Sequence, residues 1–509
     1  MLNHEKGPRV APSTSTLASD FTAETASYHG KCTTPPIDAH TNSDLQSLPT
    51  ANTAEKKLLL KIDLHILPCL CILYALAFLD RVNIANARSF GLFDDLKLYG
   101  NRFNAALTIF FVPYILFEIP SNIFLKHFSP RYWISGCMFM FGAVTFSQGF
   151  VQSYTGLLIT RFLLGFFEAG MFPGCFYLIG MWYKRSEAQR RFSFFFNSTC
   201  LAGAFGGLLA SAIGKMDGLG GYRGWRWIFI IEGLLTTIAA IVGIFFIPSF
   251  VEDSSWLSPE EKEHVKDRIR ADQCSSKTEN KATVRDIFQV LQDPKIIFGG
   301  LMYISMVVPA YGYAFFGPAI ISTFKYSPIA TQLHSVAPWV CAFVFSMTIA
   351  SASDFIKHRL FFVIFSIVLA ISGFIVLLSI HNNTSIQFGG LFLITSGVYS
   401  AMPLIICWFN MNLGGHLRRA VGSAWQIGFG NIGGIIATYA FLPKDAPSYT
   451  PGYAICLGFL VLGIFSCCIY ALMIYLENER RNRALLAPIS TGGPENDIGD
   501  KSPEYRYLL

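Results

Sequence analysis

Two opposite charges lie seven residues apart within a long apolar run. Arg161 and Glu168 interrupt the otherwise apolar stretch from Leu157 to Trp182. Seven residues are close to two helical turns, so both side chains would point to one side of a helix, about 10 Å apart along its axis. Gly165 lies on the same face, where it leaves room for a partner helix or a ligand.

Charges placed in this way have two interpretations. A charged side chain at bilayer depth costs about 2.5–3.5 kcal/mol on insertion scales, and it usually faces a bundle interior or a watery cavity. Arg161 and Glu168 therefore indicate either a structural ion pair between helices or a site for an anion and a proton. An arginine stays charged and offers two parallel donors to a carboxylate, whereas a carboxyl group can take up and release a proton.

Other charged residues lie in or beside apolar segments. Asp80 and Arg81 are adjacent, so they would point about 100° apart on a helix. One can face a central cavity while the other braces a neighbouring helix, or both can form a charged cap at the helix end. Glu118 could pair with a basic group or line a pathway. Arg226 and Glu232, six residues apart, favour a structural tie.

Weaker signals lie in the second half of the chain. Gln426 and Asn431 could hydrogen-bond a polar substrate, although bonding between helices explains such residues at least as often. Asp354 and Arg359 are predicted to form a gating pair in the loop between two helices.

The elements that must position these residues are membrane helices. Only 14% of the 509 residues are charged and 52% are hydrophobic, whereas a soluble protein carries about 25% charged residues. Twelve apolar segments of about 20 residues predict an all-α, polytopic membrane protein with two six-helix bundles. These predicted helices span 62–85, 103–125, 132–151, 156–182, 192–214, 227–247, 295–321, 332–353, 360–380, 387–409, 420–442 and 452–476.

Two apolar blocks of nearly equal length flank a charged linker, which is the layout of a transporter built from parallel repeats. Ser258, followed by Pro259 and Glu261, predicts the start of a surface helix in that linker. The predicted parts are a disordered cytosolic tail (1–55), an N-terminal bundle (56–247), a cytosolic linker (248–294), a C-terminal bundle (295–476) and a cytosolic tail (477–509).

The distribution of Lys and Arg predicts the orientation. With both termini in the cytosol, the cytosolic loops carry more of these residues than the outer loops. Asn382 and Asn383 begin overlapping acceptor motifs for N-glycosylation, and the loop that holds them falls outside in the same orientation. We therefore predict a multi-pass protein of the plasma membrane, with glycosylation possible at either asparagine.

The sequence argues against several classes of function. It contains no nucleotide-binding P-loop, no HExxH motif and no GxSxG motif, so we predict no enzyme, cofactor or metal. The net charge of +6 is better explained by membrane topology than by nucleic-acid binding. The expected partners are the lipid bilayer, protons and a small organic anion, and the expected state is a monomer.

Five stretches resemble one family of transporters: LDRVNIANAR (79–88), RFLLGFFEAGMFPG (161–174), GWRWIFIIEG (224–233), WLSPEEK (256–262) and DAPSYTPGYA (445–454). They resemble the anion:cation symporters of the major facilitator superfamily, most of all the fungal allantoate and nicotinate permease branch, over roughly residues 56–480. The resemblance implies proton-coupled symport of a small carboxylate by alternating access. By position, Arg81 and Arg161 match arginines linked to the substrate carboxylate, and Asp80 and Glu168 match acidic groups linked to proton coupling.

The sequence departs from the superfamily at one place. The loop between the second and third helices has Lys126 and Ser129 where the superfamily pattern has Asp and Gly, while the equivalent second loop keeps Asp354. Two other functions remain open: an exporter of an organic-acid or secondary metabolite on the same fold, and a nutrient sensor without transport.

Overall fold

The computed structural model describes residues 49–127, 129–247, 250–273, 284–356, 358–414, 416–486 and 507. The chain divides into two units, Met1–Lys57 and Leu58–Leu509, and the second unit holds every predicted membrane helix. Most of the predicted N-terminal tail lies outside the described residues, as does most of the C-terminal tail.

The described residues form helices and contain no strand. Twelve predicted apolar segments correspond to thirteen of these helices. Their bounds are α1 (Pro49–Ala87), α2 (Phe93–Asp95), α3 (Arg102–His127), α4 (Pro130–Gln148), α5 (Tyr154–Glu168), α6 (Met171–Trp182), α7 (Arg185–Ile213), α8 (Gly224–Phe246), α9 (Pro259–Gln273), α10 (Val284–Leu291), α11 (Pro294–Ser322), α12 (Pro328–Ile356), α13 (Arg359–Ser379), α14 (Thr384–Met411), α15 (His416–Ala440) and α16 (Thr450–Leu486).

One predicted helix is divided in two. The apolar segment 156–182 forms α5 and α6, with a break at Ala169 and Gly170. A Cβ atom on Gly170 would lie 2.3 Å from Ser121 Oγ, so only glycine fits this close approach to α3. Pro173 lacks the N–H that would bond the carbonyl of residue 169, which removes one bond of a continuous helix.

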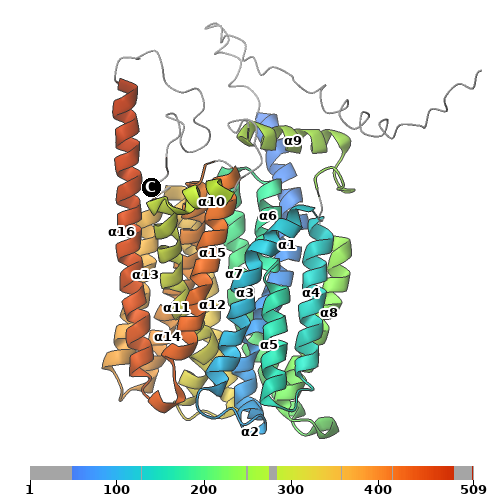
Figure 1. Ribbon diagram of the computed structural model, residues 1–509, viewed down its shortest axis with the longest axis vertical. Coiled ribbons are helices and arrows are strands. Elements are labelled where there is room, and N and C mark those ends of the chain that lie inside the picture. Colours follow the sequence, from blue (N-terminus) through green and yellow to red (C-terminus); the bar gives the residue numbers. More distant parts are fainter. Residues whose placement is uncertain are drawn as a thin grey trace, which may run out of the picture. The chain divides into compact units, whose positions relative to one another are not determined.

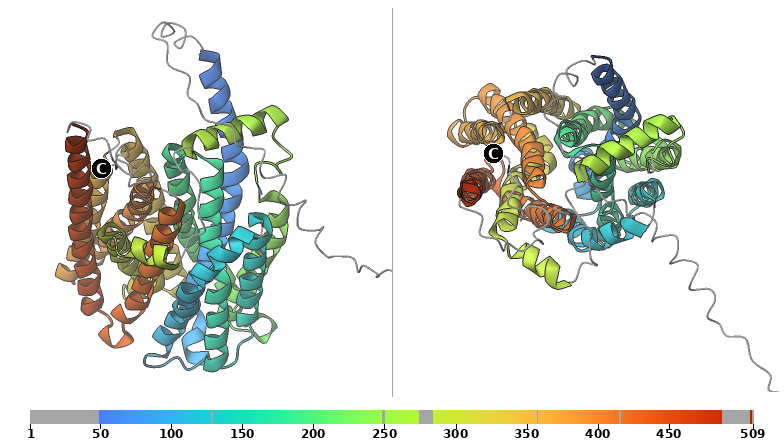
Figure 2. Two further views of the ribbon diagram at one scale, coloured as in Figure 1. Left: turned by 45° about the horizontal axis from the view of Figure 1, so that its top comes forward. Right: turned by 90° about the horizontal axis from the view of Figure 1, so that it is seen from above.

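The helices before and after the linker pack mainly among themselves. In the first set, α4 packs on α8 and α5, and α3 packs on α5. In the second set, α13 packs on α14 and α16, and α11 packs on α15 and α16. Figures 1 and 2 show α3 to α8 and α11 to α16 as two groups that lie side by side.

Three helix pairs join the groups: α7 packs on α12 and α14, and α3 packs on α15. Glycines allow these contacts to be close. A Cβ on Gly203 of α7 would lie 2.4 Å from the Trp339 indole of α12, and a Cβ on Gly434 of α15 would lie 2.3 Å from the Phe111 ring of α3.

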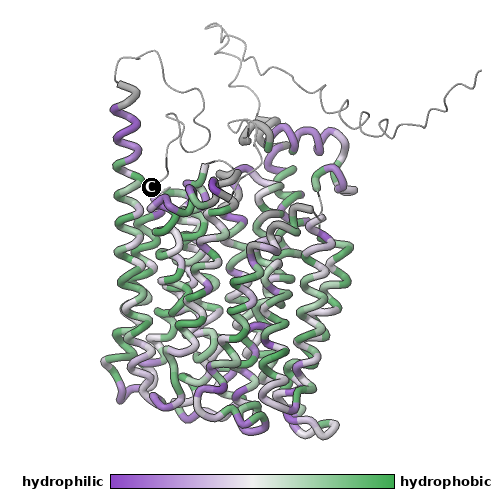
Figure 3. The backbone as a smooth tube through the Cα atoms, in the orientation of Figure 1, coloured by the Kyte–Doolittle hydropathy of each residue, from purple (hydrophilic) through white to green (hydrophobic). Residues whose placement is uncertain are grey.

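Nine helical spans in the described residues are long and apolar enough to cross a membrane, judged by length and composition. The three remaining predicted membrane segments correspond to α3, α4 and α15, which are helices of 26, 19 and 25 residues. Figure 3 shows hydrophobic residues along the length of the helices and hydrophilic residues gathered near their ends.

The linker contains the expected helix, α9, which begins with a capping box. The Glu261 N–H donates to Ser258 Oγ at 3.1 Å, and the Ser258 N–H donates to Glu261 Oε2 at 2.9 Å. Lys61 of α1 also donates to Glu261 at 2.7 Å, and this bond lowers the pKa of the Glu261 carboxyl.

Candidate functional site

A small central cavity lies between the two groups of helices. Its volume is about 30 Å³, which is room for a water molecule but not for an organic acid. Of the predicted substrate-binding residues, Arg81 and Asn431 line it. Five tyrosines also line it: Tyr74, Tyr114, Tyr303, Tyr311 and Tyr399.

Arg81 of α1 is the buried cation of this cavity. Its Nε donates to Glu168 Oε1 of α5 at 2.9 Å, and its Nη2 bonds the same oxygen. Its Nη1 donates to the hydroxyl of Tyr311 on α11, so one guanidinium connects the two groups of helices. The rings of Phe110 and Tyr114 lie 5.2 and 5.1 Å from it, within range of cation–π attraction.

Helix α5 presents Arg161 and Glu168 on one side, as their spacing predicts. Arg81 lies between them, because Glu168 binds its side chain and Arg161 Nη1 donates to its backbone carbonyl at 3.1 Å. Gly165 leaves room for a helix and not for a ligand: a Cβ there would lie 2.0 Å from the Phe110 carbonyl of α3. Arg161 itself is buried and is not among the residues that line the central cavity.

Asp80 does not line the cavity and instead lies against helices of the first group. Its carboxylate is fully buried and accepts no hydrogen bond from the described residues. Arg161, Glu168 and the hydroxyls of Thr145 and Thr236 lie close enough to act on it electrostatically. The structure therefore agrees with one of the two interpretations of this adjacent pair, in which Arg81 faces the cavity and Asp80 packs against neighbouring helices.

Glu232 of α8 is a site residue that the sequence interpretation missed. It is fully buried, lies within electrostatic reach of Asp80, and accepts no hydrogen bond from the described residues. The predicted tie between Arg226 and Glu232 is wrong, because Arg226 donates to the Gly149 carbonyl at 3.0 Å and lies over the Trp225 ring. The sequence did contain a signal for this residue, which was a carboxylate inside an apolar helix. The six-residue spacing places that carboxylate away from Arg226 on the helix.

Gln426 lies away from the cavity. Its Nε2 donates to the Gly299 carbonyl of α11 at 3.4 Å, and its Oε1 accepts from Asn410 of α14 at 3.2 Å. Gln426 therefore bonds one helix to another, which is the alternative to substrate binding that the sequence left open. Glu118 of α3 is buried without a hydrogen-bond partner in the described residues, and its Oε2 approaches Gly428 of α15.

The predicted gating residues form an ion pair between α12 and α13. Arg359 Nη2 lies 3.7 Å from Asp354 Oδ1. Arg190 of α7 also lies close enough to Asp354 to act on it electrostatically, so a residue of the first group of helices faces this pair.

The two asparagines of the predicted glycosylation motifs differ in their contacts. Both are exposed, but Asn383 is the N-cap of α14, and its Oδ1 accepts from the N–H groups of Ser385 and Ile386 at 3.1 and 3.3 Å. Asn382 precedes this cap.

Comparison with known sequences identifies the family to which this chain belongs. Residues 70–438 match the profile of the Major Facilitator Superfamily. The chain belongs to this superfamily. It is therefore a membrane transporter and not an enzyme, and its fold is the twelve-helix fold of that family.

Related facilitators support this assignment over nearly the whole chain. The major facilitator-type transporter hxnP of Emericella nidulans is 30% identical, and the match covers 92% of this chain and 99% of hxnP. The high-affinity nicotinic acid transporter of Saccharomyces cerevisiae is 28% identical, with 92% and 88% covered. The predicted resemblance to fungal transporters of this type is thus confirmed.

Solved facilitator structures share the fold. A bacterial homolog of the human lysosomal transporter Spinster, in an inward-facing and occupied conformation, superposes with a TM-score of 0.59. It is 14% identical, and the match covers 80% of this facilitator and 95% of the homolog.

Proposed function

We propose that this facilitator is a plasma-membrane symporter that moves a small organic anion together with a proton by alternating access. The observation that carries the proposal is Arg81, a buried guanidinium at the central cavity between the two groups of helices. The guanidinium is the side chain best suited to bind a carboxylate, because its planar donors match both carboxylate oxygens.

The surroundings of Arg81 favour a small and partly aromatic acid. Tyrosine rings offer flat apolar surfaces, and their hydroxyls, with the amide of Asn431, offer hydrogen bonds at the same cavity. The nicotinic acid transporter is a relative of this chain, and nicotinate has the charge and shape that such a cavity would accept.

Glu168 gives a physical route to coupling. In this conformation it accepts two bonds from Arg81, so an incoming carboxylate must compete with it. A proton on Glu168 would remove its negative charge and release the guanidinium for the substrate. Proton binding and anion binding would then strengthen each other, which is the requirement for symport.

Asp80 and Glu232 supply a second place for a proton. Two buried carboxyl groups that act on each other disfavour a state in which both are charged. Arg161 is a cation that acts electrostatically on Asp80. In this proposal Arg161 stabilises the pair and holds α1 by its carbonyl, whereas Arg81 binds the substrate.

Substrate entry requires the helices around the cavity to separate, because the cavity is too small for an acid. Asp354 and Arg359 are proposed gate residues on the side where α12 ends and α13 begins. The contacts of Asn104 and Thr108 with α15 would close the other side.

Uptake of radiolabelled nicotinate by purified protein in liposomes tests the proposal. An inward proton gradient should raise accumulation, and a proton-conducting ionophore should abolish the increase. Accumulation that is indifferent to the gradient would reject proton coupling. A panel of competing unlabelled carboxylates would define the substrate if nicotinate itself is a poor one.

Arg81→Lys tests the role of the guanidinium. Loss of a charge-assisted hydrogen bond costs roughly 1.5–3 kcal/mol, so we expect kcat/KM for the anion to fall roughly 10- to 150-fold. Arg88→Lys is the matched control, because Arg88 lies over the rings of Phe93 and Phe103 and not at the cavity. Equal effects of the two substitutions would show that Arg81 has no special role in anion binding.

A further inference from the structure

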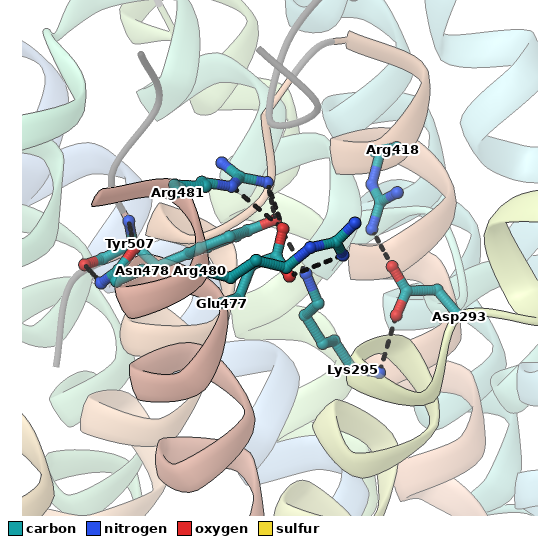
Figure 4. Close-up of polar contacts among 8 residues, drawn as sticks. All are labelled: Asp293, Lys295, Arg418, Glu477, Asn478, Arg480, Arg481 and Tyr507. Carbon is teal, nitrogen blue, oxygen red and sulfur yellow. Dashed lines mark hydrogen bonds and ion pairs between the residues drawn. The ribbon is translucent and has the colours of Figure 1, made fainter. Parts of the chain in front are cut away.

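Tyr507 lies in a site built by the start of α11 and the end of α16. Figure 4 shows its contacts with Lys295, Asn478 and Arg481. The tyrosine is almost completely buried, although it belongs to the polar segment that the sequence predicts as a cytosolic tail. A large side chain that is buried in such a polar segment indicates a specific contact.

The backbone of Tyr507 is recognised by one side chain. Its N–H donates to Asn478 Oδ1 at 3.0 Å, and its carbonyl accepts from Asn478 Nδ2 at 2.9 Å. A side-chain amide that bonds both groups of one residue reproduces the pairing of a neighbouring strand. Main-chain bonds of this kind hold extended peptides in many recognition sites, while a pocket for the side chain supplies specificity.

The phenol of Tyr507 lies between two cations. Lys295 Nζ donates to its hydroxyl at 2.9 Å and lies 4.3 Å from the ring centre. The Arg481 guanidinium carbon lies 4.8 Å from the same ring centre, and its Nη2 is 3.5 Å from the hydroxyl. Cations near a tyrosine ring are attracted to its π-electrons, so this pocket favours an aromatic side chain with a hydroxyl group.

Acidic neighbours bond the residues that carry these cations. Glu477 accepts from Arg481 Nε at 3.0 Å. Asp293 caps α11 by accepting from the Lys295 backbone N–H at 2.9 Å, and it pairs with Arg418 of α15. The Arg481 side chain and the backbone of Lys295 are thus held by bonds that do not involve the tail.

We propose that Lys295, Asn478 and Arg481 form a peptide-binding site that recognises a tyrosine by its backbone and its phenol, and that Tyr507 of the same chain occupies it. The site is separate from the central cavity and does not depend on the proposed function. Its occupation fixes Tyr507 to the ends of two helices of the second group.

Binding of a peptide added in trans tests this proposal with the full-length protein. The probe is a fluorescent peptide of residues 501–509, KSPEYRYLL, and its anisotropy is measured with purified wild-type protein and with the Tyr507→Ala variant. Wild-type protein should bind it at least about tenfold more weakly, because its own tail competes at a high effective concentration. The same peptide carrying Tyr507→Ala should not bind, whereas a peptide carrying Tyr505→Ala should bind like the parent.

A second variant tests the site itself. Asn478→Ala in the Tyr507→Ala protein should weaken peptide binding about tenfold, since two hydrogen bonds to the ligand are lost. Unchanged thermal unfolding of the double variant would show that the site, and not the fold, was altered; if it does not fold, Lys295→Met replaces it. Three outcomes would overturn the proposal. The parent peptide could bind wild type and Tyr507→Ala equally, or it could bind neither protein. The two tyrosine-substituted peptides could also bind equally.

Discussion

Arg81 shows how one side chain can connect substrate binding, proton binding and the contact between two groups of helices. Its guanidinium bonds Glu168 within the first group and Tyr311 of the second. Each of its three nitrogens already donates to one of these partners, so a substrate carboxylate would compete with them for the guanidinium. The charge on Glu168 therefore decides how strongly Arg81 is held.

Glu168→Gln tests this exchange. The amide keeps the size of the side chain but has no negative charge, so it imitates the protonated acid. We expect that anion binding no longer strengthens at acidic pH. We also expect that accumulation of the anion in a proton gradient falls to the level that exchange alone produces. Counterflow of labelled anion, which needs no net proton movement, should persist.

Glu118→Gln is the matched control for that experiment, because Glu118 is also buried but is not hydrogen-bonded to Arg81 in this conformation. If Glu168→Gln retained full gradient-driven accumulation, the carboxyl that carries the proton would have to be another one, with Asp80 and Glu232 as the next candidates.

At the scale of single elements, the packing of α5 on α3 depends on Gly165. Its hydrogen atom occupies the place where a Cβ would lie 2.0 Å from a backbone carbonyl. A backbone atom cannot rotate away as a flexible side chain can, so the two helices would have to separate. Such a movement would also displace Arg161 and Glu168, which lie on the same helix.

Gly165→Ala should therefore destabilise the protein by about 1–3 kcal/mol, the usual cost of overpacking, and lower uptake as well. Gly136→Ala is the matched control, since a Cβ at that position on α4 has no neighbour within 4 Å. Thermal unfolding in detergent gives the comparison. Equal midpoints for the two variants would contradict the close contact between α5 and α3.

The start of α14 gives a different prediction, on glycosylation. Asn383 uses its side-chain oxygen to cap the helix, so we expect the glycan on Asn382. In a eukaryotic expression host, Thr384→Ala removes the motif of Asn382 and should increase mobility on a gel. Ser385→Ala removes the motif of Asn383 and should leave the mobility unchanged.

Asn383→Gln separates the two roles, because the motif Asn382–x–Thr384 remains while the cap is altered. Loss of such a cap costs about 0.5–2 kcal/mol, so thermal stability should fall while the glycan remains. A glycan that disappears with Ser385→Ala and survives Thr384→Ala would instead assign it to Asn383.

At the scale of the whole molecule, polar contacts join the two groups of helices where α3 begins and α15 ends. Thr108 and Thr438 share a hydrogen bond of 2.7 Å, and Asn104 donates to the backbone carbonyls of Thr438 and Phe441. In an alternating-access cycle these bonds would form and break in each turnover. They therefore stabilise the conformation in which this side is closed.

The double variant Asn104→Ala, Thr108→Val should shift the equilibrium toward the conformation that is open on this side. A loss of about 1–2 kcal/mol corresponds to a shift of roughly 5- to 30-fold. Spin labels at the exposed positions 99 and 444 would report a longer distance. Thr160→Val is the control, because that hydroxyl bonds only carbonyls of its own helix, and it should leave the distance distribution unchanged.

The sequence by itself determined the helices and their local features. Apolar segments near the thickness of a bilayer must satisfy their backbone groups internally, so their length and composition predicted where the membrane helices lie. Some predicted bounds were wrong: α1 begins at Pro49 instead of 62, α7 at Arg185 instead of 192, and α16 ends at Leu486 instead of 476, because helices continue into polar sequence beyond the apolar segment. Local spacing likewise placed Arg161 and Glu168 on one side of α5 and predicted the capping box of Ser258 and Glu261. Each of these features depends on residues within a few turns of one another.

Only the tertiary structure decided which polar groups meet. It placed Glu232 near Asp80, turned Gln426 toward Asn410, and brought tyrosines from four helices to the cavity of Arg81. It also broke the helix at Gly170, where α3 approaches. These outcomes depend on how separate helices rotate and pack against one another, and helical periodicity fixes which residues share a face but not what that face will meet.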